Sequence, residues 1–220
     1  AISACEKGGK WEKALDLLQD MQNYNIKPDV ISYSAAISSC EKCGQWEKAL
    51  GIIMEMQSRG TEPTEVTYSA AITACFNRGR YREACDLFEG AQRKGHYPNF
   101  ALQATAEWDL HGFDLPESCM LLAQALISAM QSKSYELPSF GDIVVITGKG
   151  HGSGPEGPVL QKYVPRFLQD CSGPEISRIE GNDGAFAISH ESLRDWYDSS
   201  RWKVFRSIVK GEDKIWPPPL

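Results

Sequence analysis

The sequence predicts an α-solenoid of helix-turn-helix repeats followed by a small α/β two-layer sandwich. Two observations support this fold class. Similar residues recur every 35 positions through the first 99 residues, and after them the order becomes strand, helix, strand, helix and hairpin. The expected boundaries are 1–99 for the repeats (a partial unit at 1–29, then 30–64 and 65–99), 105–190 for the sandwich and 191–220 for a C-terminal extension.

Each repeat is expected to form two helices. The first apolar stripe of the second repeat has the helical spacing i, i+3, i+4, i+7 and consists of Tyr33, Ala36, Ile37 and Cys40. Gly44 is placed to cap that helix, and a second stripe runs from Trp46 to Met56. A single helix pair cannot bury both stripes, so stacked repeats are expected to share one core.

Two further residue sets recur at this period. Cys5, Cys40 and Cys75 are equivalent, and we expect them to be small core residues. Trp11, Trp46 and Tyr81 are also equivalent, and we expect them to be core anchors. Cys40 and Cys43 form a CxxC pair, but no second pair completes a set of four zinc ligands, so no metal site is expected there.

The composition and charge of the chain limit the classes of function that it can have. Of the 220 residues, 42% are hydrophobic and 24% are charged, which is ordinary for a globular protein, and no apolar run is long enough to predict a membrane span. The formal net charge is −6. Residues 1–99 contribute −1 (12 Lys and Arg against 13 Asp and Glu) and residues 100–220 contribute −5 (11 against 16). Nucleic-acid binding by this chain must therefore depend on base contacts and local geometry.

The pattern V-x-Y-S-x-x-I-x-x-C-x-x-x-G-x-W-x-x-A-L, with a proline near the end of each unit, resembles the pentatricopeptide repeat family over residues 1–99. The 35-residue spacing and that proline disfavour the 34-residue tetratricopeptide repeat. Because the chain begins at Ala1 in the middle of a helical unit, we expect an N-terminally truncated protein with further repeats and any targeting segment upstream.

The resemblance implies binding of single-stranded RNA, with one base per repeat read by the fifth and last residues of the repeat. These positions are Ser34 with Thr64 and Ser69 with Asn99, while Asp29 closes the first repeat without its partner. Ser69 with Asn99 resembles the adenine-favouring combination of the family, and the base for Ser34 with Thr64 is unassigned. Relatives act mostly in chloroplasts and mitochondria, so the resemblance also implies one of these compartments.

The second part of the chain has its own expected elements. The segment 108–112 (WDLHG) is followed by an amphipathic helix at 117–131 and a buried strand at 143–146. A glycine-rich loop at 147–154 then precedes a helix at 159–168. The residues 181–184 (GNDG) are typical of a hairpin turn between strands at 176–179 and 185–188. This order predicts a compact α/β sandwich.

Three short motifs of this part resemble the Smr domain: Asp109-Leu110-His111-Gly112, Thr147-Gly148-Lys149-Gly150 and Asn182 to Gly184. Trp108 departs from the leucine usual in that family. The resemblance implies nuclease activity, which some members have and others lack. RNA is the favoured substrate, although relatives that nick DNA leave a DNA substrate open.

A chemical rationale supports the nuclease expectation. Asp109 and His111 are two apart on an expected strand, so their side chains should point the same way and suit activation of a water or a 2′-hydroxyl. His151 would protonate the leaving oxygen, and Lys149 would add positive charge. The loop residues Thr147, Gly148, Lys149 and Gly150 would bind phosphate at a helix N-terminus. No cofactor is evident, and Asp109 offers one carboxylate to a divalent cation.

Three interpretations of the function of this chain stay open. The first is an RNA-processing endonuclease, the second a noncatalytic factor that binds or stabilises RNA, and the third a helical scaffold for a protein partner. An Asp–His pair can also be purely structural, and a glycine-rich loop can be only a turn. The extension at 191–220 is expected to pack on the sandwich as a helix, with stacking of its aromatic side chains on nucleic acid as the alternative.

Overall fold

The computed structural model describes residues 1–98, 106–131, 142–148 and 157–211, so Asn99, Lys149, Gly150 and His151 lie outside the described residues. The chain divides into two units, Ala1–Tyr97 and Pro98–Leu220, and each is described here by itself. Among the described residues, no helix combines the length and the apolar character needed to cross a bilayer.

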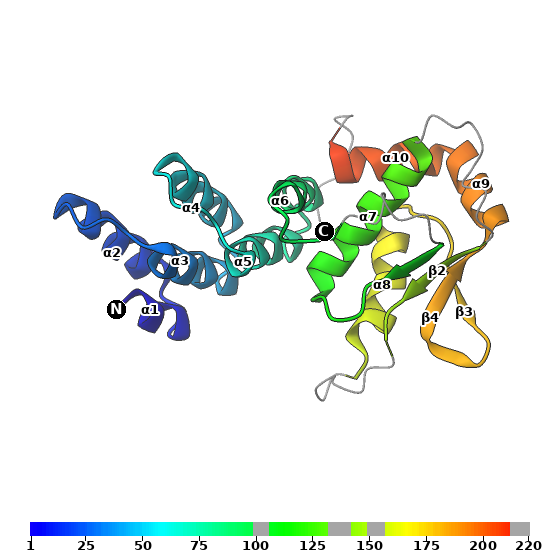
Figure 1. The fold of residues 1–220 in the computed structure, drawn as a ribbon, viewed down its shortest axis with the longest axis horizontal. Helices are drawn as coiled ribbons and strands as arrows, with labels where there is room; N and C mark the ends of the chain where they lie inside the picture. The colour runs from blue at the N-terminus through cyan, green and yellow to red at the C-terminus, as the bar shows by residue number, and fades with distance from the viewer. Residues whose placement is uncertain (99–105, 132–141, 149–156, 212–220) are drawn as a thin grey trace. The chain divides into compact units, whose positions relative to one another are not determined.

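The first unit consists of three successive helix pairs (Figure 1). They are α1 (Ile2–Lys7) with α2 (Trp11–Asn23), α3 (Val30–Lys42) with α4 (Trp46–Ser58), and α5 (Glu65–Phe76) with α6 (Tyr81–Arg93). Helix α3 packs against α1, α2, α4 and α5, so the first helices of adjacent pairs stack. This arrangement confirms the helical repeat region predicted from the 35-residue period.

Glycines end the first helix of each pair. Gly9, Gly44 and Gly79 have φ values of 61°, 66° and 67°, the left-handed conformation that side chains with a Cβ disfavour. The N–H group of Gln45, just after Gly44, donates to the Cys40 carbonyl at 2.8 Å and closes the last turn of α3. The recurring glycine therefore has a local conformational cause, as the sequence indicated.

The burial of the recurring residues agrees with the prediction for the cysteines and contradicts the prediction for the aromatic residues. Cys5, Cys40 and Cys75 are all buried, which confirms their prediction as core residues. The equivalent aromatic residues, Trp11, Trp46 and Tyr81, are only half-buried, so the prediction that they are core anchors was wrong. At Trp46 the outer face of the ring meets a charged group of the next repeat, because the Arg80 guanidinium lies over it at 4.3 Å from its centroid.

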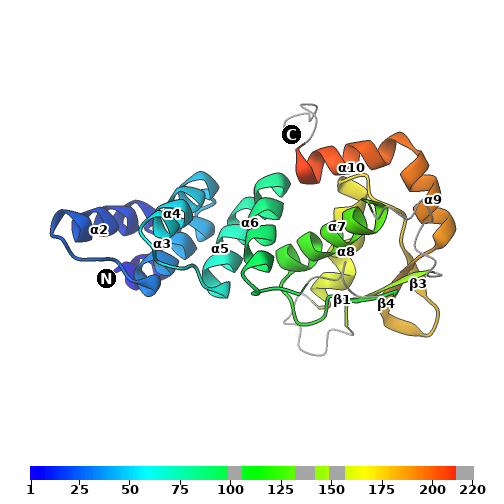
Figure 2. The same ribbon diagram turned by 45° about the horizontal axis from the view of Figure 1, so that its top comes forward.

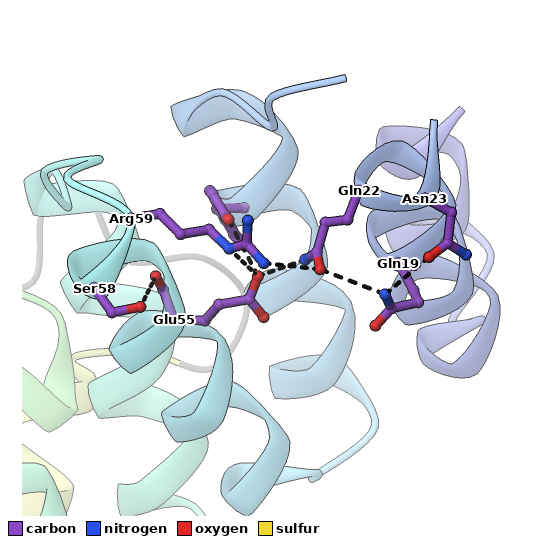
Figure 3. A network of polar contacts seen from close by, with 7 residues as sticks. Gln19, Gln22, Asn23, Glu55, Ser58 and Arg59 are labelled. Carbon is purple, nitrogen blue, oxygen red and sulfur yellow. Dashed lines mark hydrogen bonds and ion pairs between the residues drawn. The ribbon is translucent and has the colours of Figure 1, made fainter. Parts of the chain in front are cut away.

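A polar network joins the first two repeats (Figure 3). The Glu55 carboxylate accepts hydrogen bonds from Gln22 Nε2 at 2.6 Å and from the Tyr33 hydroxyl at 3.3 Å, and it pairs with Arg59 Nε at 3.0 Å. Arg59 also donates to Gln22 Oε1 at 2.9 Å. Burial, and then the nearby Glu55 charge, raise the pKa of Tyr33. Because the partners come from α2, α3 and α4, the network favours this stacking order.

The second unit contains a four-stranded sheet in the order β1-β2-β4-β3. Its strands are β1 (Glu107–Asp109), β2 (Ile143–Ile146), β3 (Ser177–Ile179) and β4 (Asn182–Ile188). Strands β1 and β2 are parallel, whereas β4 is antiparallel to both β2 and β3. The helices α7 (Leu115–Gln131) and α8 (Val159–Asp170) pack against each other and lie together on one side of the sheet (Figure 2). The unit is thus a small mixed sheet with helices.

The hairpin turn lies earlier than expected. The turn is formed by Glu180 and Gly181, with φ of +75° at Gly181, and Asn182 to Gly184 already belong to β4. The glycine at position 181 supplies the left-handed residue that ends β3, so the second glycine of the GNDG segment is free to pair in the sheet. The predicted turn at 181–184 was therefore misplaced.

The C-terminal extension continues this unit as two helices, α9 (His190–Asp198) and α10 (Ser200–Lys210). Trp196 is 1% exposed, and its Nε1–H donates to the Ser172 carbonyl at 2.7 Å. Phe205 is also buried and meets Trp196 edge to face, with ring centroids 5.2 Å apart. The structure therefore supports helical packing of the extension on the preceding loop rather than a free aromatic surface.

Candidate functional site

The predicted base-reading residues occupy the N-terminal ends of the first helices. Tyr33 is fully buried, whereas the neighbouring Ser34 on α3 is half-buried and Ser69 on α5 is equally half-buried. Thr64 is exposed as the N-cap of α5, and Asp29 is exposed as the N-cap of α3. Asn99 lies outside the described residues.

Two of these side chains meet at a third. The Ser34 Oγ lies 2.8 Å from Thr67 Oγ1, and the Thr64 Oγ1 lies 3.0 Å from the same atom. The Thr64 N–H also donates to Thr67 Oγ1 at 3.2 Å. The fifth and last residues of repeat 30–64 are therefore linked through one buried hydroxyl of the next repeat.

The first repeat ends in a different arrangement. The Asp29 carboxylate accepts hydrogen bonds from the Ser32 hydroxyl at 2.7 Å and the Ser32 N–H at 2.8 Å. These bonds, the hydroxyl first, hold the pKa of Asp29 below its ordinary value. Asp29 therefore presents a charged acceptor at this end of the helix, where repeat 30–64 presents hydroxyls.

Sequence reasoning missed two exposed aliphatic residues beside the predicted base-reading residues. Ile31 is 70% exposed and Val66 is 67% exposed. Each precedes a predicted base-reading serine, Ser34 or Ser69, by three residues and so lies on the same helix face. The available signal was an aliphatic residue recurring at the 35-residue period outside the buried stripes. Such side chains provide apolar contact area next to a polar side chain.

The charge of the first unit is unevenly distributed. The segments 6–13, 41–48 and 78–83, which contain the turns inside each helix pair, hold 8 Lys and Arg against 5 Asp and Glu. The rest of residues 1–97 holds 4 against 8. Lys42 pairs with Glu6 of the preceding repeat at 2.8 Å, and both groups keep solvent access. The turns inside the helix pairs thus form the cationic edge of the repeats, which suits a phosphate backbone.

In the second unit, Asp109 and His111 lie close together, but through a turn and not through the shared strand that was predicted. Strand β1 ends at Asp109, and His111 lies in the turn that follows, so the two residues do not share a strand. The His111 N–H donates to Asp109 Oδ1 at 2.9 Å, and His111 Nδ1 lies 3.6 Å from Asp109 Oδ2. Gly112, with φ of +91°, lies in the same turn as His111. The side chains of His111 and Asp109 are 71% and 53% exposed.

The first residues of the glycine-rich loop lie beside this pair. A Cβ built on Gly148 would be 3.6 Å from His111 Cβ. The N–H groups of Thr147 and Gly148 both donate to the Gly184 carbonyl, at 2.8 and 3.0 Å, and the Thr147 hydroxyl donates to it at 3.2 Å. The Gly148 carbonyl accepts from Gln161 Nε2 at 2.8 Å. These two N–H groups, expected to bind phosphate, are instead paired within the protein.

The three motifs of the Smr resemblance therefore converge on one edge of the sheet. Gly184, which receives the loop bonds, has its own N–H held by Asn182 Oδ1 at 3.1 Å. Lys149, Gly150 and His151 lie outside the described residues. The described part of the site offers an exposed carboxylate, an exposed imidazole and a glycine next to them. This set can bind and transfer a proton at the surface.

Comparison with known proteins finds a repeat family that matches the first unit. The model of the PPR repeat family matches residues 1–42 and 29–77, and the PPR repeat model matches residues 66–96. No family match corresponds to a C-terminal Smr domain. No curated protein matches the chain. The 35-residue period, the stacked helix pairs and these matches agree that residues 1–96 are PPR repeats.

Proposed function

We propose that this protein binds single-stranded RNA through its repeats and cleaves that RNA at the Asp109–His111 site of the second unit. PPR repeats imply sequence-specific RNA binding. The observation that carries the proposal is the placement of Ser34, Thr64 and Ser69 at the accessible ends of stacked helices, flanked by exposed Ile31 and Val66.

RNA recognition would use two kinds of contact. Hydroxyl groups of Ser34, Thr64 and Ser69 can donate to and accept from base edges, and Asn99 would complete the pair of the last repeat. The aliphatic side chains of Ile31 and Val66 would pack on base faces. The slightly negative net charge of residues 1–99 means that these contacts, rather than bulk attraction to phosphate, must supply much of the affinity.

Cleavage would begin with proton transfer at the Asp109–His111 pair. Neutral His111 would take the proton of a 2′-hydroxyl or of a water, and Asp109 would stabilise the imidazolium formed. The oxygen so activated attacks phosphorus, and the bond to the 5′-oxygen breaks. In this proposal His151 gives a proton to the leaving 5′-oxygen, while Lys149 and Gly150 bind the phosphate. An RNA with a single 2′-deoxy nucleotide at the cut distinguishes the two nucleophiles, because only attack by the 2′-hydroxyl is blocked.

The test combines binding and cleavage on the same RNA. The purified chain is expected to bind labelled single-stranded RNA and to shorten it, whereas a chain with both Asp109→Ala and His111→Ala is expected to bind but not cut. Unchanged cutting by the doubly substituted chain would remove the pair from the mechanism. Parallel reactions with a chelator, with added Mg²⁺ and with single-stranded DNA test the metal requirement and the substrate.

A noncatalytic RNA-binding factor is the second candidate. It is favoured by the pairing of the Thr147 and Gly148 N–H groups with Gly184, since this part of the loop has no free N–H for a phosphate. Binding of RNA without any product in the cleavage assay would support this candidate. PPR proteins are typically organellar, and we propose a chloroplast or mitochondrial location, which imaging of the tagged full-length protein tests.

A further inference from the structure

The buried hydroxyl of Thr67 joins the two reading residues of repeat 30–64. Thr67 is 0% exposed, and its Oγ1 contacts Ser34 Oγ, Thr64 Oγ1 and Thr64 N at 2.8, 3.0 and 3.2 Å. We propose that Thr67 is a positioning residue that couples Ser34 to Thr64, so that together they present one hydrogen-bond donor and one acceptor to an RNA base. This inference rests on the proposed function, in which both hydroxyls face a base.

The coupling follows from the protons on Thr67 Oγ1. A hydroxyl carries one proton and two lone pairs. The Thr64 N–H donates to this oxygen and occupies one lone pair. One proton and one lone pair then remain for two neighbouring hydroxyls. One neighbour must therefore donate to Thr67, and the other must accept from it.

The two readers are left in opposite states. When Ser34 donates to Thr67, its oxygen offers only lone pairs to a ligand, and Thr64 keeps its own proton as a donor. When the chain of hydrogen bonds reverses, Ser34 becomes the donor and Thr64 the acceptor. The pair can change its direction, but it cannot present two donors or two acceptors while Thr67 is hydrogen-bonded to both.

This constraint determines which RNA bases repeat 30–64 can bind. The Watson–Crick edge of each of the four RNA bases carries a donor next to an acceptor, in one order or the other. A reversible pair matches either order, so repeat 30–64 contributes affinity with little choice between bases. The adjacent repeats lack this device: the residue 35 positions after Thr67 is Leu102, which has no hydroxyl, and the residue 35 positions before it is Ser32, whose hydroxyl donates to Asp29.

The test is a mutant cycle on RNA affinity. Binding of the full 220-residue chain to labelled nonamers of adenosine, cytidine or uridine is measured by fluorescence anisotropy at low salt. An RNA of a single base presents the same base to every repeat in any register. The substitutions are Ser34→Ala, Thr64→Val and both together, each with Thr67 intact and with Thr67→Val.

With Thr67 intact, the loss of affinity in the double variant should differ from the product of the single losses by at least about threefold. With Thr67→Val, the losses should multiply to within about twofold, because the two hydroxyls then act independently. The loss caused by Ser34→Ala should agree within about threefold among the three RNAs. Thr67→Ser, which restores the hydroxyl, should behave like the unsubstituted chain, and so should Thr73→Val in the same helix.

Two results overturn the inference alone: losses that multiply while Thr67 is intact, or a Ser34→Ala effect confined to one base. Failure of the unsubstituted chain to bind any RNA overturns the proposed function and the inference together. The cycle with intact Thr67 decides the coupling by itself, so the test stands even where Thr67→Val does not fold. Circular dichroism and thermal melting establish the folding of each variant.

Discussion

The imidazole of His111 lies against Gly148, although the two residues belong to different segments of the second unit. A Cβ at position 148 would be 3.6 Å from His111 Cβ and 3.8 Å from His111 Cδ2. The contact arises because β1 and β2 are parallel neighbours, with Asp109 opposite Ile146. The residues that follow the two strands therefore meet at the same edge of the sheet.

Gly148→Ala should weaken both the fold and the proposed cleavage site. Position 148 has φ of +75°, where a side chain with a Cβ costs about 1–2 kcal/mol. The new methyl group would also contact His111 at an ordinary van der Waals distance and restrict its imidazole. We expect a loss of unfolding free energy of about 1 kcal/mol, measured by urea denaturation, and a lower cleavage rate.

Gly181→Ala is the matched control for this variant. Gly181 has the same φ of +75°, and a Cβ there would meet nothing within 4 Å. It should lower stability by a similar amount while leaving the cleavage rate unchanged. Equal cleavage rates in the two variants would show that the contact between Gly148 and His111 has no part in catalysis.

Asp109→Asn and His111→Ala should each lower the rate of RNA cleavage by at least about 100-fold, the usual range for a lost proton-transfer group. RNA affinity should stay within about twofold, because the repeats supply the binding. Both side chains are more than half exposed, so neither change should reduce stability much. Asp195→Asn, an exposed change on α9, is the control for loss of one surface carboxylate.

Ile31→Ser and Val66→Ser should each weaken RNA binding by about fivefold, the effect of losing about 1 kcal/mol of apolar contact with a base. The melting temperature should not change, because the two side chains are 70% and 67% exposed in the protein. Met54→Ser, which removes another side chain of 67% exposure from α4, should affect neither property. Similar RNA affinities for all three variants would exclude a base contact at Ile31 and Val66.

The stability of the repeats should fall at alkaline pH. Burial raises the pKa of the Cys75 thiol to about 12 and that of Cys40 to about 11, from an ordinary value of 9.0. A raised pKa contributes stability that is complete below pH 9 and is lost as the pH approaches the folded value. Each buried thiol should therefore lower the unfolding free energy by about 1.4 kcal/mol per pH unit above pH 9.

Urea unfolding between pH 8 and pH 10.5 measures this loss, with a flat baseline expected below pH 9 and an upper limit that stays below the folded pKa of both thiols. Cys75→Ala removes one of these thiols. It should therefore reduce the slope of the unfolding free energy against pH by the contribution of one thiol. Thr73→Val, a change on the same helix that leaves every thiol in place, serves as the control. The same slope in Cys75→Ala and in the unsubstituted chain would contradict the assignment.

The sequence by itself determined the helical repeats. The period, the capping glycines such as Gly44 and the burial of Cys40 follow from signals carried within a few residues, and a helix pair responds to them locally. The order of strands and helices in the second unit was readable for the same reason. Local signals also placed Ser34 and Asp109 in their segments.

Only the tertiary structure decided which partners these residues meet. The link from Ser34 to Thr67 and the cover of Arg80 over Trp46 join side chains of adjacent repeats, and no local pattern specifies such pairs. The pairing of the Thr147 and Gly148 N–H groups with Gly184 depends on the register of β2 against β4. Hydrogen bonds between distant segments depend on how those segments pack, and this is the physical reason why the sequence located the candidate sites but not the state of their donors and acceptors.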